Sequence, residues 1–122
     1  MEKTYLRGTW QQKRAFSPAV VTSGAGKTIY VAGHTGQTAD DGRDLAGDFD
    51  AQCRQTFRNI EKTLADLVTM TVFMIDVRHT TQMTEIRTEI FGKGFPASAA
   101  ITVAGFAQPS IMIEIQGIAV VP

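Results

Sequence analysis

The chain has 122 residues, of which 43% are hydrophobic and 20% are charged, an ordinary balance for a single soluble domain spanning residues 1–122. Its 12 basic and 12 acidic residues give a formal net charge of zero, which argues against nucleic acid as a partner because neutralising phosphates needs a cationic excess. A single cysteine, Cys53, excludes an intrachain disulfide and a zinc site built on cysteine pairs.

Strand-like segments come first along the chain. Residues 4–9 and 14–22 have the composition of edge strands, and a proline interrupts the second of them. A glycine-rich turn at 23–26 precedes a predicted strand over 27–33. The following stretch, 34–47, is rich in glycine and aspartate and predicts a long polar loop.

A helix is predicted over residues 48–65, because apolar residues recur there at steps of three and four. These residues form one stripe of the helix: Phe49, Cys53, Phe57, Ile60 and Leu64. Their spacing places Cys53 in the core rather than at a reactive site. A strand rich in β-branched residues is predicted immediately afterwards, over 67–75.

A second helix is predicted over residues 80–91, with Thr80 or Thr81 as its N-cap and Gly92 as its stop signal. Two further strands complete the chain, over residues 99–105 and 111–121, and a turn at residues 108–110 joins them. The predicted order is therefore β-β-β-α-β-α-β-β.

This order indicates an α+β domain in which two helices cover one face of a mixed six-stranded sheet. On the last strand, Ile113 and Ile115 share one face, while Ile118 and Val120 lie on the other. A two-layer domain with apolar residues on both sheet faces needs a partner, and zero net charge does not oppose self-association. We therefore expect a homo-oligomer.

No segment has the pattern of a targeting or membrane sequence. The first residues lack an apolar signal-peptide region, and no apolar run approaches the roughly 20 residues of a membrane span. We expect a cytoplasmic protein that does not interact with membranes.

Glu114 is the first candidate for chemistry, because it lies inside the apolar run 111–118. A carboxyl group that is partly dry at such a place has a raised pKa and suits acid–base work at neutral pH. The alternative is an ordinary strand glutamate that points to solvent or pairs with a basic side chain.

Other candidates are less specific. The glycine-rich segment 92–98 joins a helix to a strand and suits anion binding, but it is also a plain helix stop. His34 follows a strand, where it can donate to a ligand or act as a structural hydrogen-bonding group. Arg14 and Arg87 are candidates for holding a carboxylate, although exposed arginines are more often solvated or paired.

Six segments together resemble the Rid (YjgF) family of reactive-intermediate enamine/imine deaminases, and they follow the family order from about residue 14 to residue 121. They are Ala15–Pro18, Val31–His34, Gln55–Ile60, Thr71–Met74, Phe95–Ser98 and Ile113–Ala119. The resemblance implies a chorismate-mutase-like fold and a barrel-shaped homotrimer with clefts between subunits. It also implies hydrolysis of 2-aminoacrylate and other enamines or imines to 2-keto acids with release of ammonia, without a metal or organic cofactor.

The residue-by-residue match to the family is partial. Glu114 falls on the family glutamate that positions a water, and Gly33 falls on the family glycine. Phe16 stands where tyrosine is common, and Thr84 stands near a position often held by asparagine. Ser98 replaces the arginine that holds the substrate carboxylate in deaminating members, so the chain resembles an arginine-lacking member.

Two functions follow from this comparison. The first is hydrolysis of a small enamine or imine with Glu114 as the catalytic group acting through one water. The cleft would then be lined by substrate-binding residues Phe16, Gly33, His34, Thr84, Arg87 and Ser98. The alternative is a non-catalytic trimer that binds a keto acid or another small carboxylate. The family also has a glycine-containing loop after the first helix, where this chain has only residues 64–66.

Overall fold

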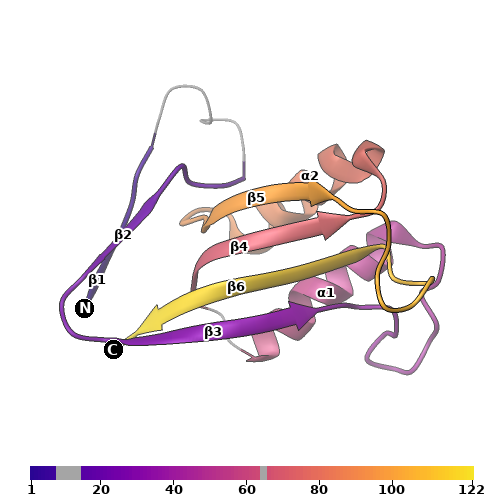
Figure 1. The fold of residues 1–122 in the computed structure, drawn as a ribbon, viewed down its shortest axis with the longest axis horizontal. Coiled ribbons are helices and arrows are strands. Elements are labelled where there is room, and N and C mark those ends of the chain that lie inside the picture. Colours follow the sequence, from indigo (N-terminus) through magenta and orange to yellow (C-terminus); the bar gives the residue numbers. More distant parts are fainter. Residues whose placement is uncertain (8–14, 64–65) are drawn as a thin grey trace.

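The computed structural model describes residues 1–7, 15–63 and 66–122 (Figure 1). The elements follow the predicted order, with one short 3-10 turn, η1, added before the second helix. Their bounds are β1 Glu2–Tyr5, β2 Val20–Ser23, β3 Lys27–His34, α1 Phe49–Thr63, β4 Leu67–Met74, η1 Val77–His79, α2 Thr80–Phe91, β5 Ala97–Thr102 and β6 Ile113–Val121.

The main sheet has four strands in the order β3-β6-β4-β5, in which β4 and β5 are parallel and the other pairs are antiparallel. The prediction of one six-stranded sheet is therefore corrected, because β1 and β2 pair only with each other among the described strands. The turn between β2 and β3 explains the separation. Gly24 adopts φ +86° there, and a Cβ on Gly26 would stand 2.8 Å from the carbonyl oxygen of Val121. The chain thus turns away from β2 just before β3 joins β6, as Figure 1 shows.

Several of the predicted strand ranges differ from the residues that are paired in the structure. The first two strands were expected over 4–9 and 14–22, but the paired residues are 2–5 and 20–23, and residues 8–14 lie outside the described part of the chain. The fifth strand was expected over 99–105. It starts and stops earlier because its parallel pairing with β4 runs from Thr69 opposite Ala97 to Met74 opposite Thr102.

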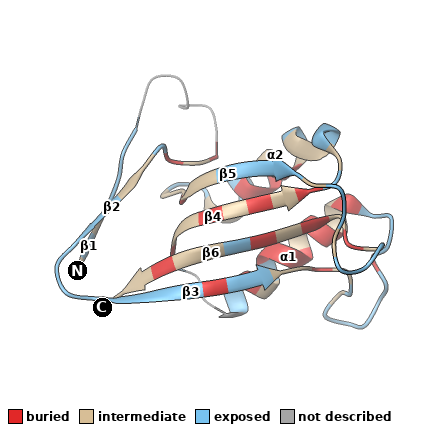
Figure 2. Ribbon diagram, in the orientation of Figure 1, coloured by how far each residue is buried: buried red, intermediate tan, exposed pale blue. Residues whose placement is uncertain are grey.

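Both helices cover the same face of the four-stranded sheet, as predicted (Figures 1 and 2). Alternate residues of β4 and β6 point toward the helices and are buried, which is the period of two expected for strands with one face in the core. The core cluster also contains Phe49, Cys53, Phe57 and Ile60 of the predicted α1 stripe and the inner residues Met83 and Ile86 of α2, whereas the fifth residue of the stripe, Leu64, lies outside the described residues. Its most deeply buried members are Cys53, Phe57, Val72, Ile113, Ile115 and Ala119.

The start of α1 is confirmed within one residue. Asp48 lies just before the helix, and its carboxylate accepts a hydrogen bond of 3.0 Å from the backbone N–H of Ala51. The end at Thr63 falls short of the predicted residue 65, and residues 64–65 lie outside the described part. The short connection from α1 to β4 therefore has only its last residue, Asp66, within the described ranges.

The bounds of α2 match the predicted range 80–91, but its N-terminal cap differs from the prediction. Neither Thr80 nor Thr81 caps it, because the 3-10 turn η1 leads directly into the helix and Asp76 caps that turn instead. The hydroxyl of Thr80 donates to the carbonyl oxygen of Val77, 2.7 Å away. Gly92 ends α2 as predicted, with φ +68° and its N–H bonded to the helix.

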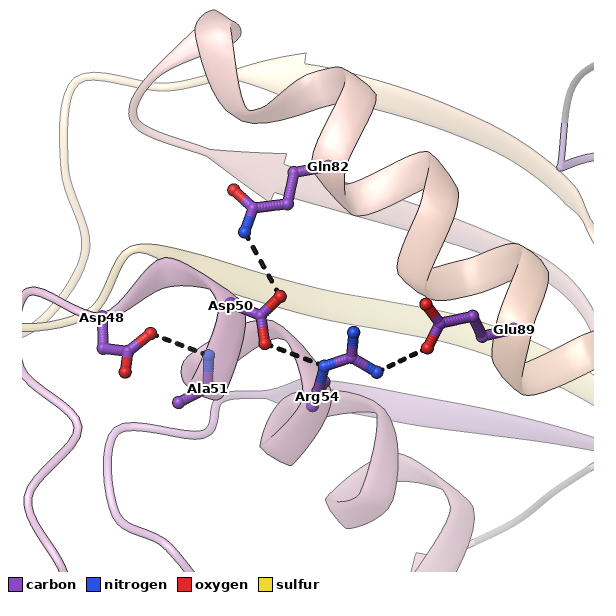
Figure 3. Close-up of polar contacts among 6 residues, drawn as sticks. All are labelled: Asp48, Asp50, Ala51, Arg54, Gln82 and Glu89. Carbon is purple, nitrogen blue, oxygen red and sulfur yellow. Dashed lines mark hydrogen bonds and ion pairs between the residues drawn. The ribbon is translucent and has the colours of Figure 1, made fainter.

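A charged network joins the exposed sides of the two helices (Figure 3). Arg54 of α1 donates from Nε to the carboxylate of Asp50, 2.8 Å away, and from Nη1 to the carboxylate of Glu89 on α2, 2.6 Å away. Gln82 of α2 donates to the second oxygen of Asp50 at 3.3 Å. The network thus fixes α2 alongside α1.

Gln52 is a polar residue that the core encloses completely. Its Nε2 donates to the carbonyl oxygens of Leu45 at 3.0 Å and Ser110 at 2.8 Å, and its Oε1 accepts from the N–H of Met112 at 3.0 Å. One side chain therefore connects the loop before α1 to the segment that leads into β6.

The sheet face opposite the helices stays uncovered by any described helix, and we call it the free face (Figures 1 and 2). Tyr30 of β3 lies there with 79% of its surface exposed, and it is paired in register with Ile118 of β6. Within the described ranges, no helix is both long and apolar enough to cross a membrane.

Candidate functional site

A pocket of about 540 Å³ opens between α2, β5 and the segment that precedes β2, and we call it the α2–β5 pocket. It gathers four residues that sequence analysis had singled out, together with apolar neighbours. Its lining includes Phe16, Met83, Thr84, Glu85, Arg87, Ser98 and Ala100.

Hydrogen bonds to the start of β5 fix the position of Phe16. The next residue, Ser17, donates from its backbone N–H to the carbonyl oxygen of Pro96 at 3.1 Å and from its hydroxyl to that of Phe95 at 2.6 Å. Ser17 also forms an isolated parallel bridge with Ala97. The glycine-rich segment before β5 therefore holds one wall of the pocket.

Arg87 lies on the inner side of α2 and is only 3% exposed. Its Nη1 donates to the hydroxyl oxygen of Ser98 at 2.8 Å and lies 3.8 Å from the sulfur of Met70. Its Nε is buried and has no hydrogen-bond partner among the described residues. Burial lowers the pKa of Arg87 to about 10, which still leaves the group charged at neutral pH.

A second polar residue of the lining, Thr84, already uses its hydroxyl donor within α2. The hydroxyl of Thr84 donates to the carbonyl oxygen of Thr80 one turn earlier, 2.9 Å away. Met83 and Ala100 add apolar surface, and Glu85 is an exposed acidic residue in the lining. The pocket thus has mainly apolar walls with a buried cation between them.

Glu114 and Gly33 lie together at another place. By alternation along β6, Glu114 points to the free face, since its neighbours Ile113 and Ile115 are buried under the helices. A Cβ on Gly33 would stand 2.8 Å from the carboxyl carbon of Glu114. The pairing of β3 with β6 is irregular between Val31 and His34, the stretch that contains Gly33.

His34 ends β3 beside this pair, and its Nδ1 lies 2.7 Å from the carbonyl oxygen of Ala32. The candidate residues therefore form two groups within one chain. Phe16, Thr84, Arg87 and Ser98 line the α2–β5 pocket on the helix side, whereas Gly33, His34 and Glu114 lie at β3 and β6, outside the lining of that pocket. Arg14 lies outside the described residues.

Cys53 is fully buried in the core, and burial raises the pKa of its thiol to about 12. The prediction that it is a packing residue agrees with both observations. Nowhere in the described part of the chain do three or more His, Cys, Asp or Glu side chains form a group suited to a metal ion.

The burial of Arg87 was not predicted, although the sequence carries a signal for it. Arg87 follows Met83 by four positions, so both lie on the same face of α2. A charged residue on the apolar face of a helix is unusual, since arginine is almost never fully buried without a partner.

The chain matches the family model described as Endoribonuclease L-PSP over residues 11–121. The chain therefore belongs to this family, which is the YjgF/Rid family. It is 30% identical over 102 residues to a RutC family protein of Pyrococcus horikoshii, covering 78% of this chain and 80% of that protein. It is 29% identical over 112 residues to human 2-iminobutanoate/2-iminopropanoate deaminase, covering 86% of this chain and 79% of the human protein.

Solved structures show the same fold. A Rid family protein of unknown function from Yersinia pestis superimposes with a TM-score of 0.82 at 22% identity and covers 98% of both chains. RidA from an Antarctic Psychrobacter species gives a TM-score of 0.68 at 28% identity, covering 85% of this chain and 86% of that chain. The predicted fold class and family are therefore confirmed.

Proposed function

We propose that this protein hydrolyses a small enamine or imine to the corresponding keto compound and releases ammonia. Family membership and the relation to the human imine deaminase support this reaction class. The observation that carries the proposal for this chain is the α2–β5 pocket, which collects Phe16, Thr84, Arg87 and Ser98 at one place large enough for a small metabolite.

The proposed site is completed by a second subunit. Within one chain, Glu114 lies on the free face, and the pocket opens on the helix side between α2 and β5. A neighbouring copy that packs its free face against the β5 edge would bring its own Glu114 to the pocket. Tyr30, which is 79% exposed and paired with Ile118, offers apolar surface on the free face for such packing. We propose a homotrimer with three such clefts.

Glu114 is proposed to act through one water molecule. Its carboxylate accepts a proton as the water oxygen attacks the carbon of the C=N bond, and it passes that proton to nitrogen, which gives a carbinolamine with one O–H and one NH2 group. It then takes the proton of that O–H group as the C=O bond forms and gives it to nitrogen as the C–N bond breaks. One water is consumed, and the products are a keto compound and ammonia. Gly33 lets this carboxylate lie directly against the backbone of β3, where a Cβ would stand 2.8 Å from the carboxyl carbon.

The test is ammonia release from a panel of imines generated from amino acids, compared between the wild type and Glu114→Gln. General acid–base groups typically contribute about 10²–10⁴-fold, so the variant should lose at least that lower factor. Glu61→Gln is the control, because Glu61 is an exposed residue of α1 that does not line the α2–β5 pocket. Equal rates in wild type and Glu114→Gln would refute the proposed role.

A second candidate function is binding without turnover. Ser98 stands where the family resemblance places a substrate-binding arginine, and Glu114 is outside the pocket of its own chain. A trimer that holds a small carboxylate without hydrolysing anything is consistent with both observations. Stabilisation by 2-keto acids in thermal unfolding, with no ammonia release from any member of the imine panel, would favour this alternative.

A further inference from the structure

We propose that Arg87, reaching from α2, holds the carboxylate of the ligand in the α2–β5 pocket, and that Ser98 orients its guanidinium for this purpose. The inference rests on the proposed site but not on turnover, since it concerns binding alone. It assigns the ligand to the class of small monocarboxylates.

Arg87 is a buried charge without a counter-charge among the described residues. Arg87 is 3% exposed, and no carboxylate forms an ion pair with it among the described residues. A buried, unpaired cation costs free energy, so such groups are normally paired or placed at the surface. The arrangement is explained when a ligand anion supplies the missing charge.

Within the described residues, not every donor of the Arg87 guanidinium has a hydrogen-bond partner. Nη1 is committed to the hydroxyl oxygen of Ser98, whereas Nε is buried without a partner in the described part of the chain. The edge of a guanidinium that carries Nε matches the two oxygens of a carboxylate. Because a hydroxyl can accept one hydrogen bond and donate another, Ser98 is also able to donate to the same ligand.

Ser98 and Arg87 therefore form one arrangement. An arginine at position 98 would place a second cation against the guanidinium of Arg87, which lies 2.8 Å from the present hydroxyl oxygen. Like charges at that separation are unfavourable in a buried site. A small hydroxyl group at position 98 is therefore compatible with a guanidinium that reaches the pocket from α2 and not from β5.

The lining indicates which anions fit. Arg87 is the one basic residue among the described lining residues, and Glu85 adds a negative charge to the same pocket. A dianion such as phosphate would meet one positive and one negative group, whereas a monocarboxylate needs only the guanidinium. Phe16, Met83 and Ala100 offer apolar surface to a short aliphatic body.

The experiment compares Arg87→Met with the wild type, using 2-oxobutanoate and its neutral amide as probes in calorimetry and thermal unfolding. A hydrogen-bonded charge pair is worth about ten- to one-hundredfold in affinity, so the variant should lose this factor for the carboxylate. Its affinity for the amide should change less than about threefold, and Arg87→Lys should lie between wild type and Arg87→Met.

Stability supplies a second readout. Because the methionine removes a buried unpaired charge, unliganded Arg87→Met should unfold at the same temperature as the wild type or higher. Arg54→Met is the matched control. It removes a paired arginine of α1, so it should lower the unfolding temperature and keep the preference for the carboxylate.

Three outcomes would overturn the inference. They are unchanged carboxylate affinity in Arg87→Met, misfolding or a lower unfolding temperature of that variant, and failure of the wild type to prefer 2-oxobutanoate over its amide. The double variant Arg87→Met/Ser98→Arg should regain carboxylate binding, since it returns a cation to β5. Arg87-dependent binding without ammonia release would refute the proposed reaction and leave this inference standing.

Discussion

Gly33 of β3 and Glu114 of β6 lie so close together that a Cβ on Gly33 would stand 2.8 Å from the carboxyl carbon and 2.9 Å from Oε2 of Glu114. The absence of a side chain at position 33 therefore gives the carboxylate its place on the free face. Gly33 has no left-handed backbone conformation, so the space and not the dihedral angle explains the glycine.

Gly33→Ala should consequently affect activity more than stability. The added methyl group displaces the flexible end of the Glu114 side chain. This displacement costs less than about 1 kcal/mol of stability, but it moves the carboxylate away from the position proposed for the attacking water. We expect at least about a tenfold loss in ammonia release, with an almost unchanged urea midpoint. Gly105→Ala is the control, because a Cβ there has nothing within 4 Å. Wild-type activity in Gly33→Ala would contradict the proposed placement.

Gly36→Ala should instead unfold the protein more easily. A Cβ at this buried position would lie 2.5 Å from the backbone nitrogen of Thr56 and 2.7 Å from the carbonyl oxygen of Gln52, both on α1. A helix backbone does not yield as a side-chain end does, so overpacking should cost about 1–3 kcal/mol. Urea unfolding monitored by circular dichroism measures the loss, and a cost near zero would show that α1 can shift away from the loop.

Gln52→Met should also destabilise the fold. The methionine fills a similar volume but leaves the carbonyl oxygens of Leu45 and Ser110 and the N–H of Met112 without their partner. Unsatisfied buried groups make the expected loss about 2–4 kcal/mol. Gln82→Met, on the half-buried side of α2, should cost much less in the same urea titration. Equal losses in the two variants would argue against the bridging role of Gln52.

The helices and the central strands were predictable from the sequence because their signals are local. Apolar steps of three and four indicated a helix from residue 48, and α1 begins at Phe49. The alternation in β6 likewise separates Ile113 and Ile115 from Glu114, and the structure places them on opposite faces. In each case the periodicity of one element was sufficient.

The remaining features depend on contacts between distant segments. The pairing of β1 with β2, outside the main sheet, follows from the turn at Gly24, and no local pattern distinguishes it from a strand of that sheet. A glutamine in a helix is typical of the protein surface, so the burial of Gln52 is recognised only from its hydrogen-bond partners outside α1. The sequence places Arg87 on the apolar face of its helix, but the contact of Arg87 with Ser98 depends on β5 lying beside α2.

Arg54→Gln should change the response of stability to acid. The hydrogen bond from Arg54 lowers the pKa of Asp50 and of Glu89 below their usual values of 3.8 and 4.5. Carboxyl groups with a lowered folded-state pKa stabilise the protein above the usual values, and this contribution is lost as the pH falls through the folded-state values. The variant should therefore be less stable than the wild type at pH 7, and the difference should shrink toward pH 3.

The measurement is the urea midpoint of both proteins at pH 7, 5 and 3 in low salt. Added salt should reduce the difference at pH 7, because the pairs are largely exposed and ions screen them. Thr88→Ser on the outer side of α2 is the control and should keep the wild-type dependence on pH. A difference between Arg54→Gln and wild type that is constant from pH 7 to pH 3 would show that packing, and not charge, accounts for it.

Tyr30→Arg should dissociate the proposed trimer without unfolding the chain. Tyr30 is 79% exposed within one chain, so its replacement removes little packing from the protomer. If a neighbouring copy covers the free face, however, the arginine becomes buried against an apolar surface without a counter-charge. The mass measured by light scattering should fall from three chains to one, and ammonia release should fall with it because Glu114 no longer reaches a pocket.

Val77→Arg is the matched control for this prediction. Val77 is also a large exposed hydrophobic residue, at 66%, but it lies in η1 and away from the free face. Its replacement should leave both mass and activity unchanged, which separates burial at the interface from a general effect of added charge. A trimer that survives in Tyr30→Arg would place the subunit contact elsewhere. Glu114 would then need another route to the α2–β5 pocket, and the two-subunit site would have to be abandoned.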